Sequence, residues 1–322
     1  MIQLIVRRVL LMIPLLFLIS IVIFGIAKLQ PGDAFTGTVT STDSSTSKYI
    51  EQQRKKLGYD QPIHVQYMKW ADNIAHGDLG ESVRFKRPVI DLIKERMPNT
   101  ITLGTLSLVF TYILAFPLGI ISGRKPYSPL DYSIQIGNYL LLALPSFVTG
   151  VFAIYLFAFQ LNWFPFQGSV TMGLEEGTFP YYMSKIYHAL LPALILGIMS
   201  TAGYVQFLRN DIIENSRKDY VRTARSNGIS ENKIYNKHIL RNSVIPIVTF
   251  FGGDVLSIFG GAVITETIFS YPGIGKLLIE AISGKDYPLM MALLLFFAFL
   301  GLLANLISDI TYSIVDPRIK SN

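Results

Sequence analysis

The chain has 322 residues, of which 51% are hydrophobic and only 16% are charged, with a formal net charge of +6. Its mean hydropathy is +0.42. A composition this apolar excludes an ordinary soluble domain, and the absence of cysteine excludes disulfides, thiol catalysis and thiolate metal sites. We therefore expect a protein that lies in a lipid bilayer.

Six apolar runs are each long enough to cross a bilayer, for which about 20 residues are needed. Because an open strand would leave backbone groups unpaired in lipid, the runs are predicted to be helices. The first run follows Arg7 and Arg8 and exceeds the roughly 7–15 residues of a secretory signal's apolar core, so we expect it to be retained. The chain is thus predicted to be an all-α membrane protein with six transmembrane helices, at Val9–Leu29, Ile101–Ser122, Ile134–Gln160, Ile186–Leu208, Val244–Phe269 and Tyr287–Ile310.

Lysine and arginine predict that both termini are cytoplasmic, because positive charge gathers in short cytoplasmic segments. With both ends inside, the two short outer loops carry only Lys185, Lys276 and Lys285. The net positive charge therefore reports the orientation of a multi-pass protein in the cell membrane. It does not indicate nucleic-acid binding, and no nucleic-acid partner is expected. The inner segments carry Arg7, Arg8, Arg124, Lys125, eight basic residues from Arg209 to Arg241, Arg318 and Lys320.

Residues 30–99 form the one sizeable polar segment, and we predict that it lies outside the membrane. A Thr/Ser-rich patch, Thr36–Ser47, precedes two helix-like stretches, KYIEQQRKKLG and IHVQYMKWADNIAHG, and each of these ends in glycine. About 70 residues can form a small cap, but hardly a domain with a large core of its own. Two compatible roles remain open for this cap: a structural lid, or a contact surface for a partner protein.

A basic stretch between the fourth and fifth runs, Asp219–Asn242, is predicted to form two short helices joined by a turn. The first is amphipathic and ends at Gly228, a residue suited to the left-handed position that follows a helix. Ser230 offers an oxygen to cap the second helix, and Glu231 places negative charge on its first turn. We expect this rigid, charged, cytosolic segment, called the elbow below, to bind a partner protein.

The fifth run carries glycines on one face, Gly252, Gly253, Gly260 and Gly261, and a carboxylate, Asp254, near its middle. Glycine lets another backbone approach closely, which fits plain helix packing or a tight face that lines a pore or a dimer. A carboxylate at mid-membrane costs about 2.5–3.5 kcal/mol to insert, so something must solvate or pair it. Either Asp254 lines a watered translocation path with Gly253 and Gly261, or it pairs with a base on a neighbouring helix or subunit.

Motifs along the chain resemble a known family of membrane transport proteins. In the elbow, Ala224-x-x-x-Gly228 followed by Leu240 resembles the "EAA" loop of ABC importer permeases, with Arg222-Thr223-Ala224 in place of Glu-Ala-Ala and Arg241 where many members have proline. LQPGDAF near the start and VDPRI near the end extend the likeness over essentially the whole chain. After the fifth run, ITETIFSYPGIGKLL is similar to the E-x-x-F-x-x-P-G-x-G signature of the peptide/nickel permease branch, with Glu266, Pro272, Gly273 and Gly275 at its defining positions.

The resemblance implies the type I ABC importer permease fold and a subunit that moves oligopeptides or dipeptides into the cytoplasm. It implies a heterodimer with a second, homologous permease, two cytosolic ATPases that bind ATP and Mg, and an extracytoplasmic solute-binding protein. The implied organisation is an N-terminal helix at 1–29, an extracytoplasmic segment at 30–99, a permease domain at 100–312 with a coupling loop at 209–243, and a cytosolic tail at 313–322. The implied ATPase-coupling residues are Tyr220, Arg222, Thr223, Ala224, Gly228, Leu240 and Arg241.

No catalytic residue, metal ligand or bound cofactor is predicted for this chain. The sequence lacks the nucleotide-binding motif G-x-x-x-x-G-K-[ST], so ATP hydrolysis must come from another chain. It also lacks the nucleophile motif G-x-S-x-G, and its four histidines lack the spacing of metal ligands. Three alternatives stay open: a nickel or nickel-chelate importer permease, a membrane-embedded enzyme such as an intramembrane protease, and a channel or scaffold that works alone. The protease alternative lacks a Ser/His dyad or paired catalytic Asp in the helices.

Overall fold

The computed structural model describes residues 2–29 and 61–315, with the backbone alone for 2–4, 248, 249, 251, 252, 255–257, 259–261 and 312–315. Three predictions therefore fall outside the described residues: the Thr36–Ser47 patch, the helix-like stretch at 48–58 and the tail beyond 315. The surroundings of Gly252, Gly260 and Gly261 fall outside them as well.

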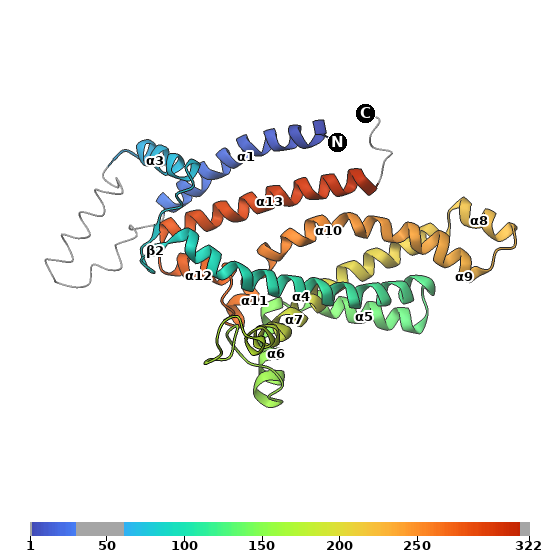
Figure 1. The fold of residues 1–322 in the computed structure, drawn as a ribbon. Coiled ribbons are helices and arrows are strands. Elements are labelled where there is room, and N and C mark those ends of the chain that lie inside the picture. The colour runs from blue at the N-terminus through green and yellow to red at the C-terminus, as the bar shows by residue number, and fades with distance from the viewer. Residues whose placement is uncertain (1, 30–60, 316–322) are drawn as a thin grey trace.

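The described chain is mostly helical, as the apolar runs predict (Figure 1). Its only strands, which the sequence did not predict, are β1 (Glu81–Ser82) and β2 (Arg87–Pro88), an antiparallel pair in the polar segment before the second apolar run. The helices are α1 (Ile2–Leu29), α3 (Ile63–Ala75), α4 (Val89–Arg124), α5 (Pro129–Ala143), α6 (Ser146–Ala153), α7 (Phe179–Ser216), α8 (Asp219–Ser226), α9 (Glu231–Ile234), α10 (Arg241–Gly261), α11 (Val263–Ile268), α12 (Ile274–Ser283) and α13 (Tyr287–Val315), with the π-helical segments η1 (Ile154–Gln160) and η2 (Tyr235–Leu240).

Four of these helices, α1, α4, α7 and α13, are long and apolar enough to cross a membrane, and a bent pair formed by α5 with α6 and η1 makes up to five. The predicted fifth run, Val244–Phe269, forms α10 and then the separate short helix α11. Much of α10 is described by its backbone alone, and α10 is not among these candidates. The described residues therefore contain four or five candidate spans, where the sequence predicted six.

The predicted third span, Ile134–Gln160, is not a single helix. α5 meets α6 at a bend of 99°, which falls at Leu144 and Pro145. Proline disfavours helical backbone angles in the residue before it, and Leu144 is extended, with φ −86° and ψ 126°. Pro145 then occupies the N-cap position of α6, where its missing N–H costs nothing. The bend therefore has a local cause that the sequence contains.

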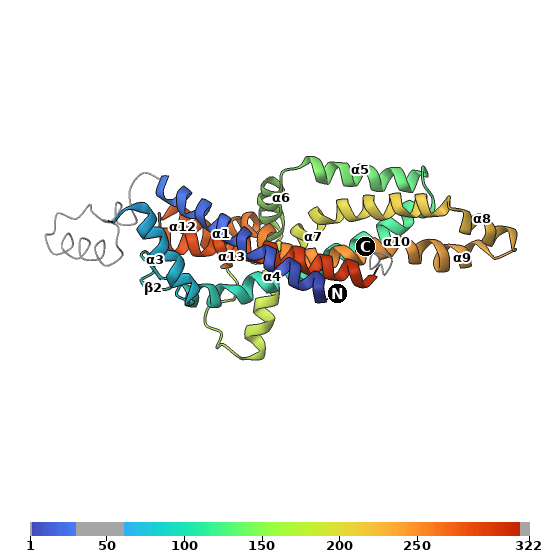
Figure 2. The ribbon, with the colours of Figure 1, turned by 90° about the horizontal axis from the view of Figure 1, so that it is seen from above.

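The two longest helices, α4 with 36 residues and α7 with 38, pack side by side through the middle of the molecule (Figures 1 and 2). They approach closely at Gly197 of α7, where an ideal Cβ would lie 2.7 Å from Cβ of Phe110 and 2.9 Å from the carbonyl oxygen of Ser107. The Thr111 hydroxyl also donates a hydrogen bond to the Gly197 carbonyl, at 3.2 Å. Gly197 therefore permits the backbone approach that holds the centre of the fold together.

One end of the molecule is formed by α3, the β hairpin, α12 and the start of α13 (Figure 1). Asp286, which is buried, ties these segments together: its carboxylate accepts from the Ser82 hydroxyl at 2.5 Å and from the Arg84 N–H at 3.0 Å. The same carboxylate accepts from the Leu289 N–H at 3.3 Å and so caps α13. The described part of the polar segment before the second apolar run is therefore fixed to the last helix.

The opposite end carries the elbow, formed by α8 and α9 (Figures 1 and 2). The start of α1 and the end of α13 point toward this end and are joined by an ion pair between Arg8 Nε and Asp309 Oδ2 at 3.0 Å. The last turns of α4 and α7 reach the same end. The described N-terminal residues therefore lie beside the end of α13, at the end of α1 that points toward the elbow.

We expect Gly197→Ala to destabilise the protein by about 1–3 kcal/mol, the usual cost of overpacking. The new methyl group would meet the backbone of α4, which cannot rotate away. Gly203→Ala is the matched control, because Gly203 lies on the same helix and nothing lies within 4 Å of its Cβ position. Thermal unfolding midpoints in detergent measure the difference, and equal midpoints for the two variants would contradict the packing described here.

Candidate functional site

The elbow begins with α8 and a tight turn. Ala224 is buried, whereas the side chain of Arg222 is 74% exposed. Two hydrogen bonds close the turn in a Schellman motif: the Gly228 N–H donates to the Arg225 carbonyl at 3.0 Å, and the Ile229 N–H donates to the Ala224 carbonyl at 3.2 Å. Gly228 has a φ of +70°. The prediction of a left-handed glycine that ends the first elbow helix is confirmed.

The start of the second elbow helix differs from the prediction. Ser230 occupies the N-cap position, but its side chain makes no capping hydrogen bond. Glu231 instead binds Arg225 across the turn: Nε donates to Oε1 at 2.7 Å, and Nη2 donates to Oε2 at 3.2 Å. This hydrogen bonding holds the pKa of Glu231 below its usual range. Because both side chains are exposed, the pair contributes little stability.

The prediction of two short helices is wrong for the second one. α9, η2 and α10 follow one another without a break, and the residues at the two junctions, Ile234, Leu240 and Arg241, all have helical backbone angles. The π-helical turn η2 shifts the face that side chains present without ending the helix. The polar end of the elbow and the fifth apolar run therefore belong to one continuous helix.

Polar contacts fix the base of the elbow to α7, α10 and α4. The Tyr220 hydroxyl donates to Oδ1 of Asn215 at 2.9 Å, and Nδ2 of Asn215 donates to the Ser243 hydroxyl at 3.1 Å. On the other side, the Tyr235 hydroxyl donates to the Ile120 carbonyl at 3.2 Å. The elbow is therefore held by α7 and α4, and α10, which continues the elbow, is itself bound to α7.

The predicted coupling residues divide into two groups. Ala224 and Leu240 pack in the apolar core under the elbow, and their described role is packing. The remaining ones are exposed and could contact a partner protein; they are Tyr220, Arg222, Thr223, Gly228 and Arg241.

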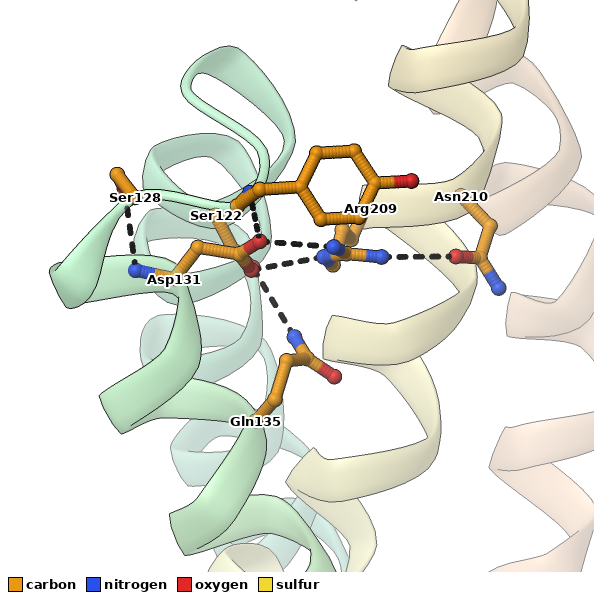
Figure 3. A network of polar contacts seen from close by, with 7 residues as sticks. Ser122, Ser128, Asp131, Gln135, Arg209 and Asn210 are labelled. Carbon is orange, nitrogen blue, oxygen red and sulfur yellow. Dashed lines mark hydrogen bonds and ion pairs between the residues drawn. The ribbon is translucent and has the colours of Figure 1, made fainter.

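A polar network beside the elbow, which we call the α5 clamp, was not predicted from the sequence; it consists of Ser122, Tyr127, Asp131 and Arg209. Figure 3 labels Ser122, Asp131 and Arg209. Arg209 donates from both Nε and Nη2 to the carboxylate of Asp131, each at 2.7 Å. Asp131 is 1% exposed and also accepts from the Tyr127 N–H at 2.7 Å and from the Ser122 hydroxyl. The sequence does contain one signal for Asp131: Ser-Pro-x-Asp is a typical helix start, and in the structure the Ser128 hydroxyl caps α5 by accepting from the Asp131 N–H.

Asp254 of α10 is bound by two tyrosines of the same chain. The Tyr112 hydroxyl of α4 and the Tyr204 hydroxyl of α7 each donate a hydrogen bond to its carboxylate. The two rings lie edge to face, with centroids 5.5 Å apart. The carboxylate of Asp254 was predicted to be bound by water or by a base, and in the structure two neutral hydroxyl groups bind it instead. Gly253, beside it, faces α13, since an ideal Cβ would lie 3.0 Å from the Ser308 hydroxyl.

Glu266 of α11 is fully buried and acts as the cap of α12. Its Oε2 accepts from the Lys276 N–H at 2.9 Å, and its Oε1 accepts from the Thr100 hydroxyl at 2.7 Å. The Thr100 hydroxyl in turn accepts from the Ile274 N–H at 2.8 Å. Gly273 is the N-cap residue and has no side chain to offer, so the carboxylate of Glu266 binds an N–H group that would otherwise be unsatisfied.

The glycines of the E-x-x-F-x-x-P-G-x-G signature make room for this carboxylate. An ideal Cβ at Gly273 would lie 2.1 Å from Oε1 of Glu266, and one at Gly275 would lie 2.6 Å from Cα of Val263. The carbonyl of Pro272 accepts a hydrogen bond from α4 at 2.8 Å. The four signature residues therefore lie together in one site, where α11 turns back into α12.

Two family patterns match the chain. Residues 115–321 match the inner membrane component of binding-protein-dependent transport systems, and residues 1–104 match the N-terminal part of the membrane component of such systems. The chain belongs to this family. It is a multi-pass membrane transport component rather than an enzyme, and its helical fold agrees with this assignment.

Relatives match over almost the whole length. The oligopeptide transport system permease protein AppB of Bacillus subtilis (strain 168) is 39% identical, and a putative peptide permease protein of Brucella suis biovar 1 (strain 1330) is 34% identical; both alignments cover 98% of each chain. A solved structure of the MetNI methionine ABC transporter, in inward-facing conformations, has a chain with a TM-score of 0.54 at 14% identity. The likeness covers 72% of this chain and 97% of that chain and shows the fold alone.

We expect Gly228→Val to open the elbow turn, because a left-handed conformation costs a residue with a side chain about 1–2 kcal/mol and a β-branched one more. Proteolytic cleavage in the elbow should become roughly 5- to 30-fold faster, because this energy raises the population of the opened turn by that factor. Gly228→Asn is the control, since asparagine tolerates this conformation and nothing lies within 4 Å of the Cβ position. Equal cleavage rates for the two variants would show that the turn does not depend on the glycine.

Proposed function

We propose that this chain is a permease subunit of an ABC importer that carries oligopeptides or dipeptides into the cytoplasm. The observation that carries the proposal is the full-length match to relatives named as oligopeptide and peptide permeases. These names support peptide as the substrate over the nickel alternative. The energy comes from separate ATPases, and this chain binds no cofactor of its own.

The proposed assembly contains a second, homologous permease, two cytosolic ATPases and an extracytoplasmic solute-binding protein. In it this chain has six membrane spans in the cell membrane, with the helix that contains α10 as the fifth, and both termini in the cytoplasm. The ion pair of Arg8 with Asp309 supports placing both termini on one side of the membrane, because it joins the start of α1 to the end of α13; the lysine and arginine distribution makes that side the cytoplasm. The segment with α3 and the β hairpin then faces outward, where a solute-binding protein docks.

The elbow is the proposed coupling loop. Closure of the ATPases on ATP moves the exposed residues of α8 and α9, and so biases an equilibrium between inward- and outward-facing states. The continuity of α9 with α10 supports this mechanism, because a push on the elbow acts directly on the helix that carries Asp254.

Asp254 is the proposed polar group of the translocation path. Gly253 and Gly261, on the same helix, are the other residues proposed for this path. Its carboxylate is partly exposed and lies where α4, α7 and α10 meet, held by Tyr112 and Tyr204. A negative charge in that position favours the passage of cationic groups, such as the basic side chains of a peptide.

A cysteine at Ser226 tests the elbow, because Ser226 is exposed and the chain has no cysteine of its own. We expect Ser226→Cys to cross-link to an ATPase subunit and to react with an impermeant thiol reagent only after the cells are permeabilised. Met172→Cys, in a loop where Met172 is 98% exposed, should react from outside. Ala224 is unsuitable because it is buried. Reaction of Ser226→Cys from outside, or no ATPase cross-link in the assembled transporter, would refute the proposed orientation or dock.

ATP-dependent uptake by the complete transporter tests the substrate and the role of Asp254. We expect uptake of peptides rather than nickel chelates. Asp254→Asn should assemble normally, since an amide can bind both tyrosines, and should reduce uptake of Lys-containing relative to Glu-containing peptides by about fivefold, the effect of losing about 1 kcal/mol of charge interaction. The control is Asp309→Asn, which removes a carboxylate that pairs with Arg8 outside the proposed path. Unchanged charge dependence in Asp254→Asn would exclude a pathway role.

A further inference from the structure

The α5 clamp joins three segments at the end of the bundle that carries the elbow (Figures 2 and 3). Asp131 lies in the first turn of α5, Arg209 on α7 and Ser122 near the end of α4. Each carboxylate oxygen of Asp131 accepts two hydrogen bonds: Oδ1 from Arg209 and Ser122, and Oδ2 from Arg209 and the Tyr127 N–H. The guanidinium of Arg209 also lies over the ring of Tyr127, 5.6 Å from its centroid.

The last turns of α4 lie between this clamp and the elbow. Ile120 accepts the hydrogen bond of Tyr235 at 3.2 Å, and the guanidinium of Arg124 lies 4.9 Å from the centroid of the Tyr235 ring. Arg124 also donates to Oδ1 of Asn232 in α9. Two residues away from Arg124, Ser122 binds Asp131. The end of α4 therefore connects the two sites: Ile120 and Arg124 contact the elbow, and Ser122 of the same turn contacts the start of α5.

Stability alone is a weak explanation for the clamp. A buried ion pair contributes little net stability, because removal of both charges from water offsets their attraction, and apolar residues of the same volume would serve as well. A bidentate arginine–carboxylate pair does fix geometry, because two parallel hydrogen bonds allow only one relative orientation of the groups. Its distinctive contribution is therefore to hold α5 in a fixed orientation to α7 and α4.

We propose that Asp131 and Arg209 are positioning residues that make α5 move together with the elbow. This inference rests on the proposed function, in which the ATPases push the elbow. α5 leads into the 99° bend and α6, so the clamp passes elbow movement to a part of the chain that the elbow does not touch. Loss of the clamp uncouples ATP hydrolysis from transport while the ATPases remain docked.

The test uses the complete transporter, purified with its partner subunits and reconstituted into vesicles, and measures peptide moved per ATP hydrolysed. Asp131→Asn removes the charge that Arg209 binds, and Ser122→Ala removes one donor from the same carboxylate with less disturbance. Glu95→Gln is the matched control, because it breaks an exposed pair in which Arg87 donates to Glu95 at 2.8 Å, away from the elbow. Each variant also carries Ser226→Cys, so that cross-linking reports ATPase docking separately.

In Asp131→Asn we expect the transport ratio to fall about tenfold, within the roughly 5- to 150-fold range of coupling between distant sites, with undiminished cross-linking. Ser122→Ala should show a smaller fall in the same ratio, and Glu95→Gln none. An unchanged ratio in an assembled Asp131→Asn transporter would overturn the proposal. If Asp131→Asn does not assemble, Ser122→Ala decides, and an unchanged ratio there would overturn it. Absence of cross-linking in the parent would instead refute the proposed ATPase dock.

Discussion

The approach of α4 to α7 at Gly197 sets the positions of the polar groups that matter in this protein. No side chain separates the two backbones there, since a methyl group would meet Phe110 and the Ser107 carbonyl at 2.7 and 2.9 Å. Toward the elbow, the same two helices supply the tyrosines that bind Asp254 and the serine and arginine that bind Asp131. Both carboxylates are therefore held by donors whose separation the glycine contact determines.

Hydrophobicity predicted the long helices well, because α1, α4, α7 and α13 each contain a predicted apolar run. Gly228 was also predictable, because the left-handed turn that it makes is a local requirement of one residue. The bend at Pro145 was not predicted, because the apolar run continues on both sides of the proline, although the proline is a local cause that the sequence contains. The sequence did not reveal that the elbow continues into α10, because the side chains change from polar to apolar along that helix while the backbone stays helical.

The polar sites could be predicted only in part. The Glu266 signature was recognisable by its resemblance to a family, yet one partner of the carboxylate, Thr100, lies 166 residues away. Asp131 and Arg209 are 78 residues apart, and no periodic pattern relates an acidic helix start to one arginine near the end of a distant helix. Asp254 was singled out because of its cost in a membrane, but its tyrosine partners lie on two other helices. Such pairings follow from the packing of the helices and not from the residues beside them.

The helix that starts at Glu231 and ends at Gly261 includes 31 consecutive residues, which at 1.5 Å per residue is about 45 Å. Such a helix can work as a lever. If it pivots near Ile258, whose side chain fills the space beside Gly104, a tilt of about one degree moves the elbow end by roughly 0.7 Å over an arm of about 40 Å. Asp254 lies close to that pivot and moves very little. The elbow end can therefore move much farther than Asp254 does, while the carboxylate and its two tyrosines stay together.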